Sequence, residues 1–178
     1  MARLFVAIRL SPRLKQRIQK IQPPRTAGIT PVAAGNLHLT LQFIGKAPVE
    51  SMLKALSGIS VASFQLEFSQ ASKFKKGLIW LGVKDSPELK NLQLDIVRSL
   101  VKVGLTLEPK RFMPHITLGR YKRHVSAEMI ELLLKEKSGA VPAETVIAFG
   151  LYASTTVDDI VTYTCIRAFA LEDSLGSE

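Results

Sequence analysis

Cysteine is almost absent from this chain, because Cys165 is the only one among 178 residues. An intrachain disulfide is therefore impossible, and no pair of cysteines is available to hold a structural zinc ion. We expect the protein to work in a reducing compartment, the cytoplasm, and to fold without covalent or metal support. Cys165 itself lies in an apolar, alternating run over 161–171, which predicts a small core residue.

Long apolar runs and glycine-rich loops are also missing. No run approaches the roughly 20 residues needed to cross a membrane, and Arg9 interrupts the short apolar start, so no secretory signal is expected. No glycine-rich loop follows an expected strand, which gives Rossmann and P-loop folds little support. Because 47% of the residues are hydrophobic and no low-complexity linker divides them, we expect one two-lobed domain over residues 1–178.

Acidic side chains are scarce relative to basic ones. The 24 lysines and arginines exceed the 15 aspartates and glutamates, which leaves a formal charge of +9. Such a charge attracts anions over long distances, and RNA, nucleotides and phosphate esters are the natural candidates. A basic surface that is merely solvated is the alternative, and the charge alone does not decide between them.

The pattern of apolar residues predicts a mixture of strands and helices. Ser11-Pro12 and Ser86-Pro87 are typical of helix N-termini, and the turn at 75–77 is typical of a hairpin with a basic tip. Because the elements do not alternate as a βαβ series, we expect an α+β fold with mixed or antiparallel sheets and two pseudo-twofold-related lobes. The expected strands are 3–9, 29–32, 36–44, 64–74, 78–83, 115–121, 145–153 and 161–171, and the expected helices are 12–21, 49–56, 87–103 and 126–137.

Two tetrapeptides repeat one pattern of histidine, aliphatic residue, threonine and leucine, at 38–41 and 115–118. On an extended strand, residues i and i+2 point to the same side, so each histidine shares a face with its threonine. Each histidine could instead be a half-buried strand residue, but the repetition argues against that reading. A zinc site is disfavoured because no His-Glu-x-x-His or paired-cysteine spacing is present and threonine is a poor zinc ligand.

The repeated side chains suit phosphate chemistry if both strands face one groove. Thr40 and Thr117 would hold phosphate oxygens, while His38 and His115 would transfer protons to and from the reacting groups. An unperturbed histidine pKa near 6.5 leaves both protonation states accessible at neutral pH. The residues therefore predict metal-free and cofactor-free phosphodiester chemistry.

Other residues could complete this groove. Arg120 could grip phosphate, although strict strand alternation puts it on the face opposite His115 unless the strand twists or ends near Gly119. Trp80 is expected in the core, and His124 is expected on the surface. Three further side chains are candidate RNA contacts, by stacking or by charge: Phe74, Lys76 and Phe112.

The chain resembles the RNA 2′,3′-cyclic phosphodiesterase family, also called 2′-5′ RNA ligase, of the two-histidine phosphoesterase superfamily. The resemblance covers nearly the whole length. It rests on the opening strand, both histidine motifs, the central strand and a strand end near the C-terminus, which here are 3–8, 36–45, 114–120, 78–83 and 151–154.

The resemblance implies a bilobal fold with two antiparallel sheets, flanking helices and a central groove. It implies hydrolysis of a terminal RNA 2′,3′-cyclic phosphate to a 2′-phosphate, with His38 as proton donor to the 3′ oxygen and His115 as proton acceptor from water. Thr40, Thr117 and Arg120 would bind the phosphate. The same groove would also join an RNA 2′,3′-cyclic phosphate to a 5′-hydroxyl through a reversible 2′-5′ linkage, and a small cyclic nucleotide would also be a substrate.

Two departures from the family pattern stand out. Members often have an acidic residue where this chain has Arg9, and an aromatic-containing approach where it has 28–35. Two alternatives remain beside the cyclic phosphodiesterase: a non-catalytic nucleotide- or RNA-binding module on the same fold, and an enzyme whose main task is 2′-5′ hydrolysis or ligation. We expect a monomer, with no membrane partner.

Overall fold

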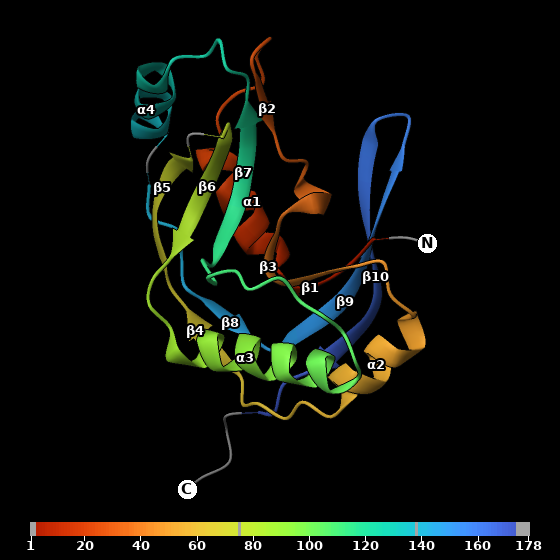
Figure 1. The fold of residues 1–178 in the computed structure, drawn as a ribbon. Coiled ribbons are helices and arrows are strands. Elements are labelled where there is room, and N and C mark those ends of the chain that lie inside the picture. The colour runs from red at the N-terminus through yellow and green to blue at the C-terminus, as the bar shows by residue number, and fades with distance from the viewer. Residues whose placement is uncertain (1–2, 75, 138, 174–178) are drawn as a thin grey trace, which may run out of the picture.

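The computed structural model describes residues 3–74, 76–137 and 139–173. In each half of the chain, two α-helices alternate with strands (Figure 1). The elements of the first half are β1 (Arg3–Arg9), α1 (Pro12–Ile21), β2 (Ile29–Pro31), the short 3-10 helix η1 (Ala34–Asn36), β3 (His38–Gly45), α2 (Val49–Ser57), β4 (Phe64–Leu66) and β5 (Phe68–Phe74). Those of the second half are β6 (Leu78–Val83), α3 (Pro87–Lys102), β7 (His115–Tyr121), α4 (Ala127–Glu136), β8 (Glu144–Val146), β9 (Ala148–Val157) and β10 (Ile160–Ala170).

One large antiparallel sheet contains eight of the strands. Its order is β10-β9-β1-β3-β7-β6-β5, with β2 paired to one end of β7. A second sheet has two strands, β4 and β8, because the expected strands 64–74 and 145–153 each divide into two. The predicted α+β class with antiparallel sheets is confirmed. The structure adds that the two lobes share one sheet, joined at the centre of Figure 1 where β3 meets β7.

A single hydrophobic cluster joins the sheet to the helices. The buried residues of each helix recur at three- or four-residue spacing, as in Leu14, Ile18 and Ile21 of α1, so each helix turns one apolar stripe to the core. Strand β1 is buried along both faces between its two end residues. None of the helices in the described part of the chain is long and apolar enough to cross a membrane.

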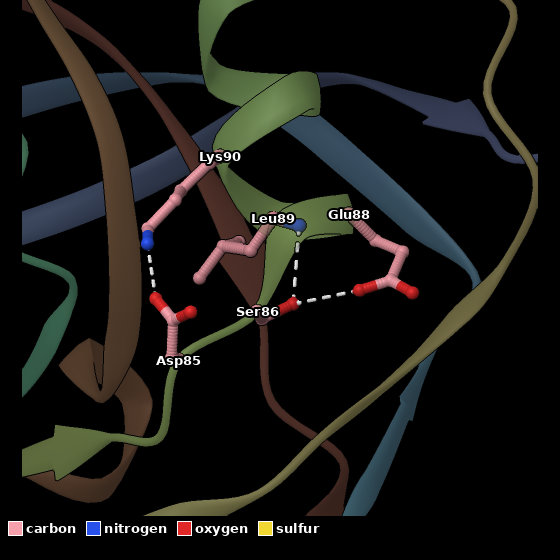
Figure 2. A network of polar contacts seen from close by, with 5 residues as sticks. All are labelled: Asp85, Ser86, Glu88, Leu89 and Lys90. Carbon is pink, nitrogen blue, oxygen red and sulfur yellow. Dashed lines mark hydrogen bonds and ion pairs between the residues drawn. The ribbon is translucent and has the colours of Figure 1, made fainter.

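The entry into α3 is fixed by a polar network, drawn in Figure 2. Ser86 Oγ accepts a hydrogen bond from the backbone N–H of Leu89 at 3.2 Å and donates to Glu88 at 3.3 Å. Lys90 forms an ion pair with Asp85 just before the helix. The serine cap satisfies an N–H group that would otherwise have no partner in the first turn. Asp85 and Ser86 of this connection line the same cavity as His115 of β7.

Cys165 is exposed, so the expectation of a core residue is wrong. It lies on β10, which forms one edge of the large sheet. Most residues of β10 are exposed although the run alternates, because no further strand or helix covers the strand along most of its length. The β9–β10 hairpin extends beyond the rest of the sheet at the upper right of Figure 1. The predicted turn between β5 and β6 is present at Lys76 and Gly77, and residue 75 lies outside the described residues.

Candidate active site

The two histidine motifs meet where β3 joins β7. Leu39 and Ile116 are paired across this antiparallel junction, and both are fully buried. The neighbours of each paired residue point to the other face of the sheet. That face carries four half-buried polar side chains: His38, Thr40, His115 and Thr117. Continuing the register by one residue on each side sets each histidine opposite the threonine of the other motif.

Both histidine rings are oriented by a backbone carbonyl two residues earlier. Nδ1 of His38 lies 2.6 Å from the carbonyl oxygen of Asn36, and Nδ1 of His115 lies 2.8 Å from that of Met113. Because a carbonyl only accepts hydrogen bonds, Nδ1 carries the hydrogen in each neutral ring. Each imidazole therefore gains or loses its second proton at Nε2, the atom that a substrate would meet.

The two motifs differ in the contacts of their threonines. Thr40 Oγ1 lies 3.0 Å from Nε2 of His38 and can donate a hydrogen bond to it. Thr117 Oγ1 has no hydrogen-bond partner within the described ranges, and no partner contacts Nε2 of His115 there. The second motif thus has both a free hydroxyl and a free basic nitrogen.

Burial is the main cause that lowers the pKa of His38 below its ordinary value. The hydrogen bond to the Asn36 carbonyl opposes this shift, whereas the positive charges of His115 and Lys15 add to it. A like charge lowers the pKa of a neighbouring base only at short range. The register of β3 and β7 agrees with this contribution, because it sets His38 and His115 on the same face of the sheet.

A β-bulge interrupts the second motif directly after its threonine. Thr117 is opposite Trp80, but Gly119 is opposite Ile79, which leaves Leu118 as an extra residue in β7. An extra residue reverses the alternation of side chains beyond it. The backbone of β2 approaches the bulge closely, since a Cβ atom on Gly119 would lie 3.0 Å from a carbonyl oxygen of β2.

The bulge brings Arg120 to the face of the histidines. Arg120 is opposite Leu78, and Thr117 is opposite Trp80. Leu78 and Trp80 are two residues apart on β6 and point to the same face, so Arg120 and Thr117 also share that face. The side chain of Arg120 is exposed and forms no ion pair with another described residue. Strict alternation along the strand predicted that Arg120 lies on the face opposite His115. The extra residue Leu118 reverses the alternation, so that Arg120 lies on the same face as His115.

The first motif has the same bulge. Ala7 is opposite Thr40 and Val6 is opposite Gln42, so Leu41 is unpaired in β3. Beyond it, Phe43 takes the position that corresponds to Arg120 and is 70% exposed, which is unusual for a phenylalanine. Sequence reasoning missed Phe43, because the bulge depends on the pairing with β1.

An aromatic cavity of about 400 Å³ lies beside His115. Phe74 stacks on Trp80 at 5.0 Å between ring centroids and meets the ring of His115 edge-on at 5.9 Å. Phe112 lines the same cavity, so two of the candidate RNA contacts lie beside the second histidine. Trp80 was expected in the core and instead lines this cavity, because its neighbours Ile79 and Leu81 occupy the core face.

A second cavity, of about 250 Å³, lies beside His38. Its aromatic residues are Phe5, whose ring centroid is 5.1 Å from that of His38, and Tyr163, whose centroid is 4.9 Å away. Tyr152 stacks on Phe5 at 5.5 Å. Sequence reasoning missed these three residues because they come from three strands that only the sheet brings together.

The remaining expected positions, Lys76 and His124, line neither of the cavities beside the motif histidines. Lys76 is exposed in the β5–β6 turn and does not line the cavity that holds His115. His124 is exposed near Gly28, which agrees with a surface role. A larger cavity of about 860 Å³ lies between β5 and α4 and contains neither motif histidine. Among the described residues, no group of three or more His, Cys, Asp or Glu side chains could hold a metal ion.

The chain is similar to known proteins along nearly its whole length. The chain is 32% identical over 177 residues to the RNA 2′,3′-cyclic phosphodiesterase of Escherichia coli, covering 95% of this chain and 96% of that protein. It is 28% identical over 176 residues to the protein of the same name from Archaeoglobus fulgidus, covering 94% and 99%. The crystal structure of E. coli LigT in apo form superposes with a TM-score of 0.78 at 28% identity, covering 96% of this chain and 98% of that one.

The family model of the 2′-5′ RNA ligase superfamily matches residues 10–152, which include both histidine motifs and both bulges. The fold is shared as well with TT0787 of Thermus thermophilus, at a TM-score of 0.76 and 22% identity. The family match covers most of the chain, including β3 and β7, which carry the two motifs. The chain therefore belongs to the 2′-5′ RNA ligase superfamily.

Proposed function

We propose that this protein hydrolyses the terminal 2′,3′-cyclic phosphate of RNA to a 2′-phosphate, with one histidine of the groove as acid and the other as base. The observation that carries the proposal is the pairing of Leu39 with Ile116, since it brings two imidazoles and two threonine hydroxyls to one face. The names of the E. coli and A. fulgidus relatives support the substrate. A LigT structure complexed with 3′-AMP supports nucleotide binding on this fold.

The reaction needs two proton transfers on opposite sides of phosphorus. Nε2 of His115 takes a proton from water as the water oxygen bonds to phosphorus. The bond from phosphorus to the 3′ oxygen breaks, and Nε2 of His38 gives its proton to that oxygen. The 2′ oxygen keeps the phosphate, and exchange with solvent then restores the two rings. Each transfer contributes roughly 10²- to 10⁴-fold to the rate.

The other groove residues bind the phosphate and the nucleoside. The hydroxyls of Thr40 and Thr117 donate hydrogen bonds to the nonbridging oxygens, and Arg120 adds a charged, bidentate contact. Aromatic side chains in the cavities supply stacking surfaces for bases, and Phe74 and Phe112 are the ones beside His115. Lys76 contributes only long-range attraction from its turn.

The assignment of acid and base rests on the difference between the two motifs. The free Nε2 of His115 suits a base that accepts a proton from water. The lowered pKa of His38 disfavours the protonated form in the free enzyme, which works against a proton donor. A bound phosphate anion between the rings counters that effect, because an opposite charge raises the pKa of a neighbouring imidazole.

The first experiment measures hydrolysis of RNA ending in a 2′,3′-cyclic phosphate, in the presence of EDTA. We expect the wild-type protein to release a 2′-phosphate end, and His38→Ala and His115→Ala each to lose roughly 10²- to 10⁴-fold in kcat. His124→Ala removes the third histidine outside the groove and serves as the matched control. Equal turnover by all four proteins would contradict the proposed mechanism.

The second experiment separates the acid from the base. In a substrate with sulfur at the 3′ position, the leaving thiolate needs little protonation, since thiols are far more acidic than alcohols. On this substrate, the loss of kcat in His38→Ala relative to the wild-type protein should be much smaller, whereas the loss in His115→Ala should remain. If His115→Ala is the variant that recovers, the two roles are exchanged.

Two other functions compete with this one. A non-catalytic RNA-binding module would bind the cyclic end without turnover, and the first experiment separates it from an enzyme. Ligation would use the same groove with a 5′-hydroxyl in place of water. Cleavage of a 2′-5′ linkage would run the other way, with the 3′-hydroxyl attacking phosphorus and the 5′ oxygen leaving. Rates on cyclic ends, 2′-5′ dinucleotides and 5′-hydroxyl acceptors at equal enzyme concentration rank these tasks.

We propose in addition that residues 1–178 form one domain that acts as a monomer in the cytoplasm. A single core cluster connects both lobes, and both motif histidines come from the same chain, so the groove needs no partner subunit. The single cysteine suits a reducing compartment. One unfolding transition and a monomeric mass in solution are the expected measurements.

A further inference from the structure

The cavity beside His38 contains two cations in addition to its aromatic residues. Arg9 lies directly across the strand pair from His38, and Lys15 comes from the first turns of α1. Both line the cavity of about 250 Å³, together with Tyr152 and Tyr163. His115 does not line this cavity, which therefore lies on the His38 side of the groove.

The two cations have no counter-ion in the described part of the chain. None of the ion pairs there includes Arg9 or Lys15. Both lysines that line the cavity of His115 are paired, Lys84 with Glu67 and Lys90 with Asp85, and Figure 2 shows the second pair. Burial and the neighbouring charge of Arg9 lower the pKa of Lys15, so the two groups lie close enough to repel each other. Uncompensated like charges at the wall of a cavity favour an anionic ligand.

Neutral hydrogen-bond donors complete the cavity. Burial, with the neighbouring Cys165 thiol, raises the pKa of Tyr152 to about 12, so its phenol remains protonated at neutral pH. Arg9 is close enough to Tyr152 to oppose that shift. A guanidinium, an ammonium and a phenol that converge on one cavity match the oxygen atoms of a phosphate group.

The direction of the proposed reaction connects this cavity to the substrate. Water attacks from the side of His115, and the 3′ oxygen leaves on the side of His38. The ribose that carries this oxygen must then lie on the His38 side, together with the 5′ carbon of the same nucleotide. This step rests on the proposed function and on its assignment of the two histidines.

We propose that Arg9 and Lys15 bind the phosphate on the 5′ side of the nucleotide whose 2′,3′-cyclic phosphate is hydrolysed. The cavity thereby distinguishes the end of an RNA chain from a free nucleoside 2′,3′-cyclic phosphate, which has no phosphate on its 5′ oxygen. The substrate class is a nucleotide with two phosphate groups, one cyclic and one on the 5′ oxygen.

The test compares kcat/KM on adenosine 2′,3′-cyclic phosphate, on the same compound with a 5′-phosphate, and on a dinucleotide with a 2′,3′-cyclic end. In the wild-type protein, at an ionic strength of about 0.15 M, we expect the second phosphate to raise kcat/KM by roughly 10- to 100-fold. The dinucleotide arm separates a phosphodiester from a terminal phosphate monoester. A gain confined to the monoester would overturn the RNA-chain substrate.

The ratio of kcat/KM with and without the second phosphate is then measured in variants. Arg9→Gln and Lys15→Met should each reduce the ratio several-fold, and the double variant should bring it close to one. Lys54→Met removes an exposed lysine from α2, with the same reduction of charge, and should keep the wild-type ratio. An unchanged ratio in the double variant, or a ratio of one in the wild-type protein, would overturn the proposal.

Binding keeps the proposal testable without turnover. Calorimetry compares adenosine 2′-phosphate with adenosine 2′,5′-bisphosphate, and the second phosphate should tighten binding in the wild-type protein but not in the double variant. Absent hydrolysis of all three substrates would count against the proposed function alone. Equal affinity for the two ligands would count against the second phosphate site, and thermal unfolding confirms that each variant is folded.

Discussion

Replacing Arg120 tests whether the β-bulge in β7 delivers a phosphate-binding group to the groove. The bulge sets Arg120 opposite Leu78, two positions along β6 from the partner of Thr117. At 3.3 to 3.4 Å per residue, this corresponds to about 7 Å along the strand. The guanidinium can therefore reach a phosphate held by Thr117, whereas strict alternation would direct it to the core side of the sheet.

The size of the expected effect depends on the hydrogen bond that Arg120 donates to the phosphate. A hydrogen bond to a charged group contributes about 1.5 to 3 kcal/mol, and each 1.36 kcal/mol corresponds to tenfold in rate. Arg120 is exposed, so solvent weakens the interaction and the lower end applies. We expect Arg120→Ala to lower kcat/KM on a 2′,3′-cyclic-phosphate dinucleotide by roughly 10- to 30-fold. The kcat/KM of Arg120→Lys should lie between those of the wild-type protein and Arg120→Ala, because lysine keeps the charge but not the bidentate geometry.

Two controls decide the interpretation. Arg123→Ala removes the same charge from an exposed position in the turn after β7 and should change kcat/KM less than about twofold, as expected for long-range attraction alone. Arg120→Ala should leave the unfolding free energy within about 0.5 kcal/mol, because an exposed side chain packs against little. Equal activity of the two variants, or a large drop in stability in Arg120→Ala, would refute the argument from the bulge.

Three further predictions concern charge and backbone. Lys15→Met removes a positive charge near His38 and should raise the pKa of His38. If His38 is the acid, the alkaline limb of the pH profile of kcat/KM should then move to higher pH. A shift of the acidic limb instead would make His38 the base. The pKa of His38 is lowered in the folded state, so the unfolded state binds more protons below about pH 6.5. The free energy of unfolding should therefore decrease as the pH is lowered through this range, and it should decrease less steeply in His38→Gln. Gly77→Ala should destabilise the protein by more than about 1 kcal/mol, because Gly77 has φ +83° and an added Cβ would lie 2.5 Å from a backbone oxygen. Unfolding in denaturant measures this loss, with Gly35→Ala at an open position as the control. Equal stabilities of the two variants would contradict the prediction.

The local elements were predictable because their causes lie within a few residues. Serine followed by proline marks the starts of α1 and α3, and each serine side chain accepts the expected bond from the first turn. Alternation placed β6 and β7 at their observed bounds. The repeated spacing predicted that each histidine shares a face with its threonine, and the pairing of Leu39 with Ile116 sets the two motifs on one face of the sheet. In each case a period of two or of 3.6 residues carries the information.

The misplaced residues depend on strand partners. Trp80 lines a cavity because its face is set by the neighbours of β6, and Cys165 is exposed because β10 is an edge strand. Phe43 and Arg120 lie on the face of the histidines because of bulges that exist only relative to β1 and β6. An alternating run specifies two faces but does not say which one is buried, nor where an extra residue shifts the register.

The sequence by itself determined the pair of histidine motifs, the basic charge and the periodic pattern of apolar residues. The motifs and the charge were enough to predict phosphate chemistry, and the apolar pattern was enough to predict an α+β fold. Only the tertiary structure decided that Leu39 pairs with Ile116, that the two bulges turn Phe43 and Arg120 to the histidines, and that Arg9 lies across from His38. The physical reason is that side-chain alternation is a local property of each strand, whereas the register between strands is set by the packing of the whole sheet.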